Sequence, residues 1–233
     1  MSETFIFFGA WYFVFLFSLT FHEAAHAWAA HKLGDDTAYE GGQVSLDPIP
    51  HIRQEPFGTI VVPILTYILG GWMMGWASCP YDPFWALNHP KKSAYMSLAG
   101  PVANLIIVII CGIIIHIGIF LGFFYAPDII EFTQVVAAKT SGFASSAAMM
   151  LSIFFSLNLL LFIFNLIPVP PLDGSGILPL FMKDDHARVY MRLINHPTLS
   201  LLGIFLAWEA FDVIYDPIHL FAINVLYPFA GYG

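Results

Sequence analysis

Charged side chains are scarce in this sequence. Asp, Glu, Lys and Arg make up 10% of the 233 residues, with only 8 basic side chains against 16 acidic ones. Hydrophobic residues make up 58%, and the mean hydropathy of +0.75 lies outside the range of ordinary soluble domains. No basic patch indicates a nucleic-acid partner. The composition therefore predicts an integral, multi-pass membrane protein that lies in a lipid bilayer.

Cysteine is nearly absent as well. Cys79 and Cys111 are far apart in the chain, and Cys111 lies within an apolar run. This excludes a disulfide framework and a cysteine metal site. The N-terminus also lacks the basic region of a secretory signal, so we expect its apolar stretch to be retained as a spanning helix.

That first apolar stretch, residues 5–30, carries two imidazoles and a carboxylate in the run Phe21-His22-Glu23-Ala24-Ala25-His26. Positions four apart share one face of a helix, so His22 and His26 can chelate one ion. The H-E-x-x-H pattern is typical of zinc peptidases, in which Glu accepts a proton from the attacking water. Because ionisable groups cost about 2.5–3.5 kcal/mol each at the centre of a spanning helix, the cluster indicates a functional site.

Two further apolar runs, residues 94–124 and 145–167, are long enough to cross a bilayer, which takes about 20 residues. The stretch from Gly58 to Gly71 is too short and predicts a re-entrant segment. Gln43 to Asp47 alternates with period two before Pro48, which predicts a short edge strand near the site. One or two helices are expected at about 198–230.

The third zinc ligand follows from a parity argument. A catalytic zinc takes three protein ligands, and the third must lie at the depth of His22 and His26. Asp173 follows the run at 145–167 on a proline-broken segment, and one intervening crossing brings it to that depth if Gly58 to Gly71 is re-entrant. The positive-inside rule agrees and places the site toward the cytoplasm, with these residues on that side: Lys32, Arg53, Lys91, Lys92, Lys183, Arg188 and Arg192. The remaining candidates fit less well: His31, His51, His89, His116, His186, His196, Glu209 and Asp212.

These residues together resemble the site-2 protease family of intramembrane zinc metalloproteases, peptidase family M50. Besides the first motif, the resemblance rests on two distal motifs in order, Gly100-Pro101-Val102-Ala103-Asn104 and Asn165-Leu166-Ile167-Pro168-Val169-Pro170-Pro171-Leu172-Asp173-Gly174. The chain looks like the compact subgroup without a PDZ domain, because no insertion of about 80–100 residues has room here. The Trp76 to Pro83 passage departs from that subgroup, in which a basic residue and further prolines are common.

The resemblance implies that His22, His26 and Asp173 bind Zn²⁺ and that Glu23 is the catalytic acid/base. It also implies that Asn165 holds the substrate backbone, that Asn104 lines or packs the substrate-binding site, and that Gln43 to Asp47 forms the membrane-associated β element of the family. The substrates would be transmembrane proteins or peptides, and the location a prokaryotic cell membrane.

The expected fold is thus an all-α polytopic membrane protein with three spanning helices around a zinc site, a re-entrant segment, a short β element and one or two C-terminal helices. Residues 1–233 would form a single domain, with a catalytic core at about 5–180. One alternative is a non-proteolytic membrane protein that uses the His, Asp and Asn groups as an ion pathway or binding site. Glu23 argues against a purely binding role, because a structural zinc site does not need that carboxylate.

Overall fold

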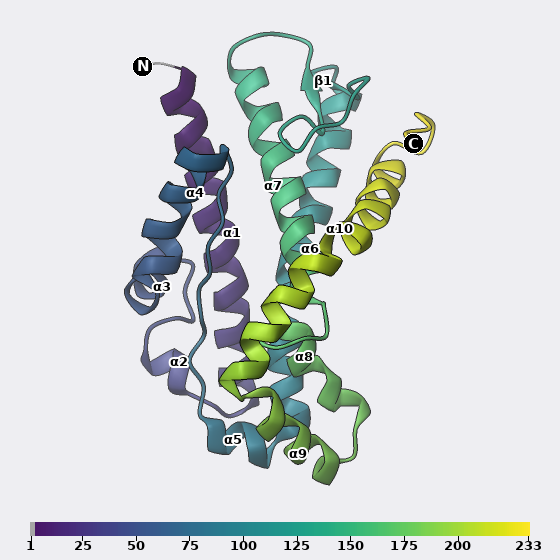
Figure 1. Ribbon diagram of the computed structural model, residues 1–233. Helices are drawn as coiled ribbons and strands as arrows, with labels where there is room; N and C mark the ends of the chain where they lie inside the picture. Colours follow the sequence, from purple (N-terminus) through teal and green to yellow (C-terminus); the bar gives the residue numbers. More distant parts are fainter. Residues whose placement is uncertain (1–2) are drawn as a thin grey trace.

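Three long helices form the centre of the molecule. A computed structural model describes residues 3–233, in which α1 (Glu3–Leu33), α6 (Pro90–Phe120) and α7 (Phe143–Asn165) lie side by side (Figure 1). Helix α6 packs against both α1 and α7. Each of the three is apolar on most of its circumference, as expected for helices in a bilayer or a large core. This arrangement is the helical core that the sequence predicts.

Within the described chain, α6 and α7 are each long and apolar enough to cross a membrane. The C-terminal helix α10 (Pro197–Leu226) meets the same test only if its two halves, which are bent by 50°, count as one span. Pro217 lies just after the bend and cannot donate a hydrogen bond to the carbonyl of Val213, which accounts for the break. Helix α1 does not meet the test over its described residues, so its crossing stays a prediction.

The segment from Gly58 to Gly71, which is expected to be re-entrant, forms a short apolar helix, and its insertion in the membrane stays a prediction. The π-helical turn η1 (Phe57–Val61) and helix α4 (Val62–Gly70) form one short apolar helix that ends at Gly71, whose φ of 77° is left-handed. Residues 72–82 then return as extended chain beside α1 (Figure 1), as far as α5 (Pro83–Asn88). A Cβ at Gly75 would overlap the carbonyl of Gly58, so the close contact between the extended segment and η1 needs glycine at position 75.

The prediction of a strand at Gln43 to Asp47 is wrong. Within the described chain this segment is irregular and lies between α2 (Thr37–Glu40) and α3 (Pro48–Gln54). Its last residue, Asp47, instead accepts a hydrogen bond from the backbone N–H of Ile49 and caps α3. A short β element does exist, but it lies between α6 and α7, where β1 (Phe124–Tyr125) pairs antiparallel with β2 (Ala137–Ala138).

After α7 the chain folds back against α6. It passes through the proline-rich turn into α8 (Asp173–Ile177), η2 (Leu178–Phe181) and α9 (Asp184–Ile194). Lys91, near the start of α6, donates hydrogen bonds to the carbonyls of Leu180 (2.6 Å) and Met182 (2.7 Å). These bonds hold η2 against α6 and so help to fix the position of α8, whose first residue is Asp173.

Candidate metal centre

Three side chains converge where α1, α6 and α8 meet. His22 and His26 lie one turn apart on α1, each only 5% exposed, and their Nε2 atoms are 3.0 Å apart. Oδ2 of Asp173 lies 3.0 Å from Nε2 of His22 and 3.2 Å from Nε2 of His26. Among the described residues this is the one group of His, Cys, Asp and Glu side chains arranged to hold a metal ion. The structure thus brings together the three side chains that the sequence predicts as ligands, and their binding of an ion stays a prediction.

The spacing of these atoms suits zinc. Four ligands placed tetrahedrally at about 2.0–2.2 Å from Zn²⁺ lie roughly 3.3–3.6 Å from one another, and the separations of 3.0–3.2 Å seen here are a few tenths of an ångström shorter. Two imidazoles and one carboxylate also match the donor types of a catalytic site, which keeps its fourth position open for water or substrate.

Gly100 of α6 leaves the space that an ion needs. A Cβ built on Gly100 would overlap Nε2 of both His22 and His26. The backbone of α6 therefore passes directly beside the coordinating atoms, and any side chain there would take the volume of the ion. This observation explains why the Gly-Pro-x-x-Asn motif begins with glycine.

The other nitrogen of each imidazole is held by an acceptor. Nδ1–H of His22 donates to Oδ1 of Asn104 (2.5 Å), and Nδ1–H of His26 donates to the backbone carbonyl of Met96 (2.7 Å). With Nδ1 protonated, the lone pair of each Nε2 faces the centre of the site. Such outer partners fix the tautomer and orientation of histidine ligands in metal sites.

Of the remaining predicted residues, Glu23 and Asn104 adjoin this centre. Glu23 is 5% exposed and follows His22 on α1. Asn165 is half-buried at the last residue of α7, and its side chain makes no hydrogen bond within the described chain. Asn104 is fully buried and contacts His22. Of the weaker ligand candidates, His51 is buried, whereas these are exposed: His89, His116, His186 and His196.

Cys79 lies on the extended segment beside the site. Burial raises the pKa of its thiol well above the ordinary value, and the nearby carboxylates of Glu23, Asp35 and Asp173 raise this pKa further. The thiol of Cys79 therefore stays protonated at neutral pH.

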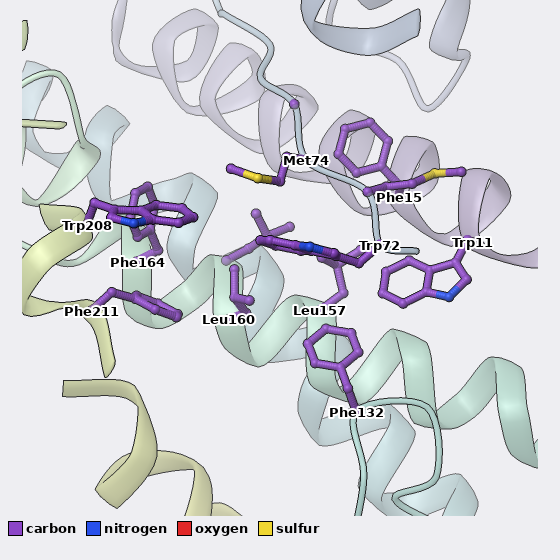
Figure 2. A pocket seen from close by; sticks show the side chains of 13 residues that line it. Trp11, Phe15, Trp72, Met74, Phe132, Leu157, Leu160, Phe164, Trp208 and Phe211 are labelled. Carbon is purple, nitrogen blue, oxygen red and sulfur yellow. The ribbon is translucent and has the colours of Figure 1, made fainter. Parts of the chain in front are cut away.

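An apolar cavity of about 320 Å³ lies farther along α1. Figure 2 shows lining side chains that point into one space from α1, the extended segment, the loop between β1 and β2, α7 and α10. Trp11 and Phe15 contribute from α1, Trp72 from the extended segment, and Trp208 from α10. The sequence analysis missed this cavity, because aromatic residues in an apolar helix give no signal of which ones surround a space.

Comparison with known proteins gives a family and several relatives. Residues 10–202 match the model of the family described as Peptidase family M50. YwhC of Bacillus subtilis (strain 168) is 36% identical over 162 residues, or 69% of this chain. Rip2 of Mycobacterium tuberculosis (strain ATCC 25618 / H37Rv) is 27% identical over 192 residues, or 82% of this chain. The names of both describe candidate zinc metalloproteases, and the match spans 64% of the length of each. No solved structure matches the chain significantly.

Proposed function

The chain belongs to peptidase family M50, and on that premise we propose that it is an intramembrane zinc metalloprotease that hydrolyses peptide bonds in or near transmembrane segments of membrane proteins. The observation that carries the proposal is the meeting of His22, His26 and Asp173 beside Gly100, within a bundle of apolar helices. Zinc is the metal in the names of the relatives, and the donor set suits it.

Each residue of the site has a part in the reaction. An ion of Zn²⁺ held by these residues would supply Lewis-acid polarisation of a peptide carbonyl and would lower the pKa of water toward about 7. Glu23 accepts the proton of the attacking water and passes it to the nitrogen of the leaving amine. His22, His26 and Asp173 hold the ion, and the half-buried amide of Asn165 binds the substrate backbone.

The extended segment 72–82 can hold the substrate. The N–H groups of Met74 and Trp76 point toward the re-entrant helix, where they bond to Thr66 Oγ1 (2.9 Å) and to the carbonyl of Gly58 (3.2 Å). Successive residues of an extended chain point their backbone groups to opposite sides, so the alternate positions form the other edge. In the described chain the N–H groups of that other edge, at Gly75 and Ala77, have no backbone partner. An unwound substrate can pair there as an added strand.

This segment also connects the cavity to the metal site. Gly75 lines the cavity beside Phe15, Ala77 packs against the core cluster that contains Phe15, and Cys79 packs against the separate cluster that contains Ala30. His22 lies seven residues after Phe15, about 10 Å along α1, and extended chain covers that distance in roughly three residues. The cavity therefore accepts an apolar substrate side chain three or four positions from the bond that is cleaved.

Filling the cavity tests that assignment. We expect Leu160→Trp to slow cleavage of a spanning peptide with Phe or Trp at that position by at least about tenfold, because about 1.5–3 kcal/mol of apolar contact is lost. Cleavage of the same peptide with Ala should change little. Leu201→Trp, at an exposed position of α10, is the control. An equal loss on all peptides would refute a side-chain pocket.

We also propose that the protein crosses the membrane several times with its metal site toward the cytoplasm. Lys32 lies near the site end of α1, and Lys91 and Lys92 lie near that end of α6. An excess of basic residues on one side favours the cytoplasmic orientation of that side.

Metal removal tests the proposed function. Purified protein in lipid nanodiscs should cleave a model spanning peptide, lose that activity completely on treatment with a chelator, and regain it when Zn²⁺ is added. The metal content should be one Zn²⁺ per chain, released slowly. A protein that exchanges its ion rapidly and cleaves no peptide would instead support an ion pathway.

A further inference from the structure

A series of buried polar side chains leads from the metal site across three helices. Asn104 of α6, Asn158 of α7 and Ser18 of α1 are each 0% exposed. Nδ2 of Asn104 donates to Oδ1 of Asn158 (2.8 Å), and Nδ2 of Asn158 donates to Oγ of Ser18 (2.9 Å) and to the carbonyl of Phe154 (2.8 Å). The series begins at His22, whose Nδ1–H donates to Asn104.

The hydrogen bonds of this series all run in one direction. Asn104 uses its oxygen for His22, so its nitrogen faces Asn158; Asn158 uses its oxygen for Asn104, so its nitrogen faces Ser18. Turning the Asn104 amide over would place two donors against each other at His22. An unsatisfied buried polar group costs about 1–3 kcal/mol, so the three groups together stabilise one orientation of the Asn104 amide.

We propose that Asn104 is the positioning residue of His22, and that Asn158 and Ser18 hold its amide in the orientation that keeps Nε2 of His22 unprotonated and directed at the zinc. Both polar atoms of Asn104 are engaged and its side chain has no exposed surface, so the substrate-binding role implied by the family resemblance is replaced by this one. The inference rests on the zinc site of the proposed function but not on its substrate.

His22 and His26 differ in how they are held. His26 is oriented by a backbone carbonyl, that of Met96, which no side-chain substitution removes. His22 is oriented by the side chain of Asn104 on α6, and the amide of Asn104 is in turn oriented by its hydrogen bond to Asn158 on α7. The series therefore links the packing of α7 against α6 to the geometry of a metal ligand on α1.

Zinc affinity tests the inference. Asn104→Leu keeps the size of the side chain but removes the hydrogen-bond acceptor. We expect this variant to lose zinc to a competing chelator at a chelator concentration about 10–100-fold lower than wild type, because the loss of an outer-sphere partner typically lowers metal affinity by about that factor. Asn104→Asp keeps an acceptor for Nδ1–H of His22, so its zinc affinity should stay well above that of Asn104→Leu. Ser156→Ala is the control, because Ser156 is a fully buried α7 residue without a hydrogen-bond partner in the described chain.

A measurement on the wild-type protein covers the case in which Asn104→Leu fails to fold. Nitrogen-15 NMR of the zinc-loaded protein should show His22 with a proton at Nδ1 and with a metal-bound Nε2 that carries no proton. The inference is overturned if Asn104→Leu binds zinc as tightly as wild type, if Asn104→Asp stays as weak as Asn104→Leu, or if Nδ1 of His22 carries no proton. A wild-type protein that binds no zinc would instead overturn the proposed function.

Discussion

Replacing Glu23 by glutamine is expected to reduce peptide cleavage by at least about 10³-fold while zinc stays bound. The amide has nearly the shape of the carboxylate but cannot accept a proton at neutral pH, and a positioned general base contributes about 10²–10⁴-fold to such a reaction. Glu23 is not among the three side chains that surround the ion position, so the metal site itself stays intact. Cleavage of a spanning peptide and zinc content, measured on the same preparation, check both parts.

Two controls make this result specific. Glu40→Gln changes an exposed carboxylate on α2 and should leave cleavage unchanged. His22→Ala removes a ligand, so it should lower zinc content and cleavage together. Full proteolysis by the Glu23→Gln protein would refute the role of Glu23, and loss of zinc from it would mean that the carboxylate helps to hold the ion.

The position of the metal site could be predicted because it depends on properties that sequence carries directly. Helical periodicity places His22 and His26 on one face, and a count of crossings brings Asp173 to the same depth. Neither step needs the packing of side chains. The structure brings the three side chains together, since Nε2 of His22, Nε2 of His26 and Oδ2 of Asp173 lie 3.0–3.2 Å apart, whereas the count of crossings stays a prediction.

The β element could not be placed, because its signal is weak. Gln43 to Asp47 alternates as a strand does, but the described chain offers it no partner, and Asp47 stabilises the start of α3 instead. The strands that do form, at Phe124–Tyr125 and Ala137–Ala138, have two residues each, too few to give a periodic pattern.

The partners of the buried asparagines could not be predicted without the tertiary structure. Asn158 and Asn165, seven residues apart, share one face of α7, yet the first is fully buried and the second only half-buried. The difference is their distance from the helix end, because Asn165 is the last helical residue and the proline-rich turn follows it. Sequence gives the face of a helix, whereas the partners at each depth depend on the neighbouring helices.

Replacing Gly100 by alanine is expected to abolish zinc binding, with a loss of affinity of at least about 100-fold and a corresponding loss of cleavage. The added methyl group would overlap Nε2 of both His22 and His26, so either the imidazoles or α6 must move away from the ion position. Alanine is otherwise the better helix former by about 1 kcal/mol, so the loss cannot come from helix propensity.

Gly112→Ala is the matched control on the same helix, because its Cβ would meet Leu226 at an ordinary contact distance of 3.5 Å. Zinc content and thermal unfolding of both variants check the result: Gly112→Ala should keep its zinc and its stability, whereas Gly100→Ala should stay folded without metal. If Gly100→Ala held zinc as tightly as wild type, α6 could not pass as close to the two imidazoles as the structure places it, and the site would have to be built differently.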